Sequence, residues 1–250
     1  MTFNLPKKAN NLHLKCILGI IVFCVTVLLI DVAYADEPIK VTISSTLHDV
    51  QFDGEWTFRS EWKESSYDNF RFDNDEQIVL RTAHQDGFFY VMVNYLTDFT
   101  YHHIADRAIV CFDGYDTSSI ADESDWCYAV SSESGNGHTL QGGSPIFQTS
   151  HFNLVKNHPD FVAHGGMSDK NDRYVTAPHA TYEFRIPIEQ IGFQDEYGFF
   201  VQVFDGNDVK AYPKEFSGKY PQKIPSPTKW GKIFSPDRSI ATFLRLSFFT

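Results

Sequence analysis

Recognisable signatures of catalysis are absent from this sequence. It contains no G-x-S-x-G nucleophile elbow, no H-E-x-x-H motif, no phosphate-binding Walker loop and no G-x-G-x-x-G dinucleotide-binding turn. Basic residues are few, because 21 Lys and Arg stand against 32 Asp and Glu and give a formal net charge of −11. Such a surface repels phosphate backbones. We therefore predict a binding protein that is not an enzyme and has no nucleic-acid partner.

Long apolar runs are also scarce, and the clearest one lies at the N-terminus. Three lysines precede an uncharged stretch from Cys16 to Ile30, and Ala33-Tyr34-Ala35 then supplies the small-x-small pattern of a signal-peptidase site. The stretch is 15 residues long, whereas a membrane span needs roughly 18 or more. We predict a signal peptide over 1–35 and a secreted or extracytoplasmic, cell-surface domain over 36–250. The alternative is an uncleaved N-terminal anchor.

Cysteine is scarce as well. Two of the four cysteines fall in the predicted signal peptide, which leaves Cys111 and Cys127 in the mature chain. Paired thiols normally oxidise in an extracytoplasmic compartment, so we predict a disulfide between them. Closing a separation of 16 residues would stabilise the fold by roughly 3 kcal/mol in the chain-entropy model. Two free buried thiols are the alternative.

Aromatic residues are abundant, with 23 Phe and 12 Tyr, and they occur in short runs that predict strands. The runs 78–84 and 88–96 flank Gln85-Asp86-Gly87, which predicts a hairpin with a tight turn. Further strands are predicted at 108–112, 126–131, 181–186, 199–204 and 232–234. No long segment keeps a helical period. The pattern therefore indicates an all-β fold, a single-domain antiparallel β-sandwich of jelly-roll-like form.

Three segments interrupt the strand pattern. The stretch 135–172 is rich in Gly, His, Asn, Ser and Asp, and 212–228 carries four prolines that would remove ladder donors. Both are predicted to be long loops, where binding surfaces usually sit. The run Ile188–Ile191 between Pro187 and Gly192 predicts one short helical turn.

Metal-binding signals are weak, and the metal is unknown. The acidic turns Asp122-Glu123-Ser124-Asp125 and Asp205-Gly206-Asn207-Asp208 offer oxygen ligands for a structural Ca²⁺, with ordinary solvated turns as the alternative. Three of the histidines in the first predicted loop, His151, His158 and His164, follow one another at spacings of seven and six. They offer nitrogen ligands for a transition metal or are simply solvated. No cofactor is required by any of these patterns.

Several short motifs, in order, resemble those of the family 9 carbohydrate-binding modules and their wider superfamily. They are Phe52-Asp53-Gly54 with Trp56 and Trp62, Asp86–Val91, the D-x-x-x-x-x-x-D run Asp106–Asp113, Tyr182–Pro187, Phe200–Asp205 and Lys229–Ile233. Together they span 52–234, nearly all of the predicted mature chain. The resemblance implies a non-catalytic β-sandwich that binds the ends of saccharides, often contains structural Ca²⁺, and could accompany a glycoside hydrolase.

The resemblance also implies a ligand site at one end of the sandwich. Tyr101, His102 and His103 would lie on one side and Tyr220 on the other, with Gln202 beneath and Tyr128 alongside. Gln202 matches the family's Gln on a late strand, while His103 and Tyr220 stand where the family has its two clamping tryptophans. Tyr and His offer less ring face than Trp, so we expect dissociation constants nearer millimolar than micromolar. These correspond to binding free energies of about −4 to −6 kcal/mol.

Two other functions fit the sequence. The haem-b-binding domain of ethylbenzene-dehydrogenase-type enzymes belongs to the same superfamily, and its motifs resemble His84–Gly87, Asp98-Phe99-Thr100 and Asp106-Arg107-Ala108. Cys111 stands where that domain has its axial Met, which makes electron transfer through haem the weaker alternative. The other alternative is a cell-envelope interaction domain without a small ligand.

Overall fold

The computed structural model describes residues 37–102, 105–114, 119–132, 134–143 and 152–235. The predicted signal peptide and the segment after Ser235 lie outside the described residues. Within those ranges, no helix is both long enough and apolar enough to cross a membrane.

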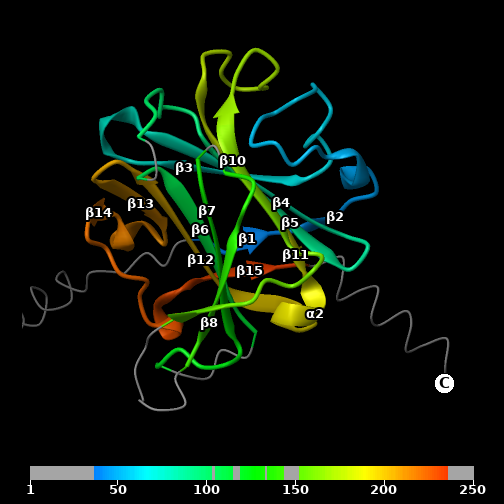
Figure 1. The fold of residues 1–250 in the computed structure, drawn as a ribbon, viewed down its shortest axis with the longest axis vertical. Helices are drawn as coiled ribbons and strands as arrows, with labels where there is room; N and C mark the ends of the chain where they lie inside the picture. Colours follow the sequence, from blue (N-terminus) through cyan, green and yellow to red (C-terminus); the bar gives the residue numbers. More distant parts are fainter. Residues whose placement is uncertain (1–36, 103–104, 115–118, 133, 144–151, 236–250) are drawn as a thin grey trace, which may run out of the picture. The chain divides into compact units, whose positions relative to one another are not determined.

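Two β-sheets packed face to face make up the fold (Figure 1), so the all-β single-domain sandwich is confirmed. The first sheet runs in the order β1 (Ile39–Lys40), β15 (Gly231–Phe234), β12 (Glu196–Asp205), β6 (Arg107–Asp113), β7 (Asp125–Ser131), β8 (His138–Gly142) and β9 (Phe152–Val155), with β13 (Asp208–Tyr212) on β12 and β14 (Gly218–Lys219) on β13. The second sheet runs in the order β10 (Val162–Ser168), β11 (His179–Pro187), β5 (Phe88–Tyr95), β4 (Gln77–Gln85) and β2 (Thr42–Ile43), with β3 (Ser66–Arg71) on β4.

The predicted hairpin and helical turn are both confirmed. β4 and β5 pair from Gln85 to Phe88, and both turn residues, Asp86 and Gly87, have positive φ, at 50° and 83°. An Asp-Gly turn of this kind matches the right-handed twist of the flanking strands. The helical turn is α2 (Ile188–Ile191), and it ends at Gly192 with φ 81°. The other helical segments among the described residues are the single 3-10 turns η1 (Leu47–Asp49), η2 (Asp73–Asp75), η3 (Lys214–Phe216) and η4 (Pro227–Lys229).

Two expectations about the architecture are wrong in part. The stretch 135–172 is not one long loop, because it contains β8, β9 and β10. Two of its glycines, Gly165 and Gly166, are strand residues in β10, where backbones approach closely. A Cβ on Gly165 would lie 2.5 Å from the Ser131 carbonyl oxygen, and one on Gly166 would lie 2.8 Å from that of Gly54. The sheets are also mixed, since β1 pairs with β15 and β2 with β4 in parallel.

Alternation along the strands divides the side chains between a central core and two outer layers. The central core is aromatic, with Phe89, Phe112 and Phe199 packed ring to ring between the sheets. Full burial of each such side chain contributes about 1.5–3 kcal/mol. The second sheet's outer face is covered by Trp56 and Trp62.

The outer layer of the first sheet contains the predicted disulfide. Cys111 on β6 and Cys127 on β7 occupy directly paired positions and are bonded. Phe200 and Trp230 belong to the same cluster and are both buried, with their rings stacked at 6.1 Å between centroids. The bond therefore cross-links neighbouring strands beneath the segment that leads to β15.

Candidate functional site

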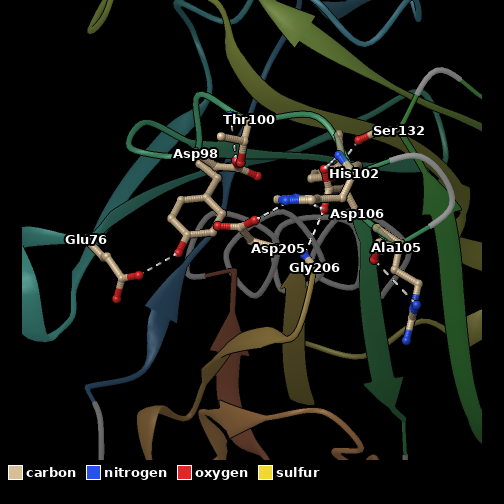
Figure 2. Close-up of polar contacts among 12 residues, drawn as sticks. Glu76, Asp98, Thr100, His102, Ala105, Asp106, Ser132, Asp205 and Gly206 are labelled. Carbon is tan, nitrogen blue, oxygen red and sulfur yellow. Dashed lines mark hydrogen bonds and ion pairs between the residues drawn. The ribbon is translucent and has the colours of Figure 1, made fainter.

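One end of the sandwich gathers a histidine and three aspartates (Figure 2). Arg107 at the start of β6 pairs with Phe204 near the end of β12, so Asp106 and Asp205 come together across the sheet. The β5–β6 connection then places His102 over both carboxylates.

His102 bridges the two carboxylates. Its Nδ1 lies 3.3 Å from Oδ1 of Asp106 and 3.1 Å from Oδ1 of Asp205. Asp106 is buried and fixed, because its Oδ2 accepts a hydrogen bond from the His102 backbone N–H at 2.6 Å and its Oδ1 accepts one from Gly206 at 2.9 Å. The His102 side chain is 46% exposed and that of Asp205 is 25% exposed, so the cluster is rigid beneath and open to solvent above.

A third carboxyl group, that of Asp98, adds to the negative charge of this end. Burial, followed by the charge of Asp205, raises the pKa of Asp98 to about 7. Its Oδ1 accepts hydrogen bonds from the backbone N–H and the hydroxyl of Thr100 at 3.1 and 3.2 Å. Burial and Asp106 also raise the pKa of Asp205, while His102 lowers it. The site therefore favours an added positive charge, either a proton or a cation.

Among the described residues, His102, Asp106 and Asp205 form the group of His, Cys, Asp or Glu side chains that lie close enough together to hold a metal ion. The ligand atoms of His102, Asp106 and Asp205 lie within 4.8 Å of one another. One imidazole nitrogen with two carboxylates suits a divalent transition metal, whereas Ca²⁺ prefers oxygen ligands alone. Three protein ligands would leave coordination positions open for a ligand.

The turns and histidines considered from the sequence have different roles. In the turn 122–125, Asp122 accepts hydrogen bonds from Ser124 and Asp125 accepts one from the Asp122 backbone, so the oxygens serve their own turn. His158 lies 2.8 Å from Glu189, and His164 is half-buried. His151 lies outside the described residues. The turn 205–208 supplies Asp205 to the cluster.

Two of the predicted ligand-binding residues flank this cluster. Tyr101 precedes His102 and is exposed, while Tyr220 is 56% exposed and donates its backbone N–H to Asn207 at 2.8 Å, in the turn that also carries Asp205. The Arg107 guanidinium lies 5.8 Å from the Tyr220 ring centroid and adds hydrogen-bond donors beside it. His103 lies outside the described residues, so its predicted role stays a prediction.

The other two predicted residues are not part of this surface, and their assignment to it is wrong. Tyr128 is fully buried between the sheets, where its hydroxyl donates to Gln190 at 3.1 Å. Gln202 is fully buried on the opposite face of the first sheet, between Phe200 and Phe204 along β12. Strand alternation puts the two side chains on opposite faces, and large aromatic neighbours cover Gln202.

The alternative function, haem binding, lacks the axial ligand that the resemblance would place at position 111. Cys111, the residue that the sequence resemblance matches to the axial Met of the haem-binding domains, is bonded to Cys127 within the outer layer of the first sheet. A disulfide sulfur there does not take that ligand's place.

Comparisons with known proteins find similarity at the level of structure only. No family model matches the chain, and no curated protein sequence is significantly similar to it. A family 9 carbohydrate-binding module from Caldicellulosiruptor kristjanssonii, in complex with cellotriose, has 14% identity and a TM-score of 0.48, covering 80% of this chain and 93% of that chain. A module of that family from the same organism, in complex with glucose, has 14% identity and a TM-score of 0.47, covering 80% of this chain and 95% of that chain. These similarities concern the fold.

Proposed function

We propose that this chain is a non-catalytic saccharide-binding domain whose ligand binds around His102, between Tyr101 and Tyr220. The supporting observation is that one tight turn, 205–208, holds both flanks of this surface. It contacts His102 through Asp205 and bonds the backbone of Tyr220 through Asn207. Two exposed rings beside a polar cluster are the parts that a sugar site needs.

The chemistry of the cluster suits hydroxyl groups. The Asp205 carboxylate and the His102 imidazole can accept hydrogen bonds from a sugar, and the Arg107 guanidinium can donate them. The Tyr ring faces can stack on the apolar face of a pyranose. A divalent cation held by the cluster would offer open positions to neighbouring hydroxyl oxygens, so binding is to be measured with and without added metal.

We also propose that the domain works outside the cytoplasm, at the cell surface or beyond it. The predicted signal peptide over 1–35 and the Cys111–Cys127 disulfide both favour an oxidising compartment. Cellular fractionation of a tagged full chain would check this placement.

The binding proposal is tested by a glycan array followed by calorimetric titration of the saccharide that the full chain retains. We expect Tyr220→Ala to weaken the affinity about two- to twelvefold, because aromatic stacking contributes about 0.5–1.5 kcal/mol. Phe193→Ala removes another exposed ring, 68% exposed. Phe193 lies just before the start of β12, whereas Asp205 ends that strand, so this variant should leave the affinity unchanged. Absence of any bound saccharide, or equal effects of the two variants, would overturn the proposal.

A further inference from the structure

A cleft of about 760 Å³ lies between the segment 58–63 and the β10–β11 connection at 170–173. The side-chain amide of Asn171 donates to the Thr57 carbonyl oxygen at 2.7 Å and ties the two walls together. None of its lining residues belongs to the cluster around His102, so this is a separate surface.

The charge of the cleft is opposite to that of the chain. Arg59 and Lys63 line one wall and Lys170 and Arg173 the other, and all four side chains are exposed. None of the four forms an ion pair within 4.0 Å with a described residue. With the single acid of the lining, Asp172, the formal balance is 4 − 1 = +3, in a chain whose net charge is −11.

The negative charge of Asp172 is used inside the fold. Asp172 is buried, its Oδ1 accepts from the backbone of Tyr174 and Val175 at 2.6 and 3.1 Å, and its Oδ2 accepts from Asn94 at 2.6 Å. None of these bonds involves the four cations of the cleft, and Asp172 forms no ion pair with any of them. Nearby Glu55 senses the charge of Lys170 but makes no ion pair with it.

We propose that this cleft binds a short acidic oligosaccharide through carboxylate or sulfate groups. Guanidinium groups match such planar or tetrahedral oxyanions with paired hydrogen bonds, and Lys adds point charges. Phe58, half-buried in the same lining, offers a ring face for a pyranose. The volume falls in the usual range for a small-molecule site, roughly 300–1,000 Å³.

The surroundings of the cleft favour a short ligand over a long polyanion. A smaller hollow of about 210 Å³ shares Phe58 and Lys63 but is lined by Asp49, Glu61 and Glu64. A nucleic acid or an anionic membrane extending past Lys63 would meet this acidic hollow and the acidic remainder of the surface. An oligosaccharide of a few units fits within the basic part alone.

The test is calorimetric titration of the full chain at low salt with tetragalacturonate, a heparin-derived tetrasaccharide and neutral cellotetraose. The key variant is Lys170→Glu/Arg173→Glu. Lys223→Glu/Lys229→Glu changes the net charge by the same amount at two exposed positions elsewhere and is the matched control. We expect at least one acidic ligand to bind, at least tenfold weaker binding by the cleft variant, and less than a twofold change in the control.

Four outcomes would overturn the inference: no binding of either acidic ligand, equal losses in the two charge-reversal variants, equal affinity for cellotetraose, or equal affinity for a DNA oligonucleotide of matched charge. Circular dichroism and thermal unfolding check that the variants fold. If the cleft variant does not, Arg59→Gln/Lys63→Gln on the opposite wall replaces it with the same expectation. Tyr220→Ala should leave acidic binding unchanged, so this inference and the proposed function can fail separately.

Discussion

At the scale of single residues, a buried carboxyl group holds distant parts of the chain together. Glu183 on β11 accepts hydrogen bonds from the backbone of Asp53 and Gly54 at 3.1 and 2.9 Å, and from the Trp62 indole at 2.9 Å. Its partners lie more than a hundred residues earlier in the sequence. Burial raises its pKa well above the usual range, although the hydrogen bonds from Gly54 and Trp62 oppose that shift.

Glu183→Gln should lower the free energy of unfolding by about 1–3 kcal/mol, because the new amide NH₂ faces a buried donor and leaves it without an acceptor. Urea unfolding followed by tryptophan fluorescence measures the loss. Glu215→Gln makes the same chemical change at an exposed position and should stay within about 0.5 kcal/mol of the unmodified protein. Equal stabilities of the two variants would contradict this account.

Residue patterns could predict part of the candidate site. The resemblance singles out the loops that carry Tyr101 and Tyr220. The turn 205–208 bonds the Tyr220 backbone and contacts His102, the residue after Tyr101. The core of the cluster is not predictable from sequence spacing, because Asp106 and Gly206, which are joined by a hydrogen bond, are 100 residues apart. No local spacing indicates such a contact. Gln202 was misassigned because a motif match fixes its position along a strand but not what covers its face.

At the scale of elements, two backbones meet without side chains between them. Gly54, at φ 81°, packs so closely on β10 that a Cβ would lie 2.3 Å from the Gly166 nitrogen. Gly87 in the β4–β5 turn has nearly the same φ, 83°, but a Cβ there would meet nothing within 4 Å. The two positions separate conformational strain from steric overlap.

Gly87→Ala should therefore cost only the left-handed backbone penalty, about 1–2 kcal/mol. Gly54→Ala also forces a methyl group against the β10 backbone. It should lower the free energy of unfolding by about 1–3 kcal/mol more than Gly87→Ala does. Thermal unfolding of both variants gives the comparison. A smaller loss for Gly54→Ala than for Gly87→Ala would show that the loop moves away from β10 freely.

Elements with strong patterns were predictable and those with polar or glycine-rich sequences were not. The hairpin of β4 and β5 has both the apolar runs and the Asp-Gly turn, so propensity and tertiary structure agree there. β10 contains Gly165 and Gly166, whose lack of side chains looks like a loop signal in sequence. Their role depends on Gly54 and Ser131, which approach only after the sheets have packed.

At the scale of the whole molecule, buried acids make stability depend on pH. Burial is the main cause that raises the pKa of Asp98, Asp125 and Glu61 to about 7. Their ordinary values are 3.8 for Asp and 4.5 for Glu. At a pH between these ordinary pKa values and about 7, the folded state therefore binds more protons than the unfolded state. The stabilisation from protonation is complete below the unfolded pKa and is lost as the pH rises through the folded pKa.

By this linkage, the midpoint temperature of thermal unfolding should decrease as the pH is raised from 5 to 8 at constant ionic strength. Asp125→Asn removes one contributor and should make the slope shallower. Asp195→Asn, at an exposed position, should leave the slope as it was. Differential scanning calorimetry across this range measures it. A midpoint that rises over the range, or an unchanged slope in Asp125→Asn, would show that these acids ionise freely in the folded state.

The pairing of β1 with β15 affects how the domain is made. Figure 1 shows the blue strand β1 beside the red-orange strand β15. In this parallel pair Ile39 lies opposite Ile233. A ribosome releases the chain from its N-terminus, so β1 has no partner until almost the whole domain has been synthesised. Pairs so far apart also form slowly, because loop-closure entropy must be overcome first. Until β15 arrives, nascent or truncated chains expose β1 and one edge of β12, where other chains can pair.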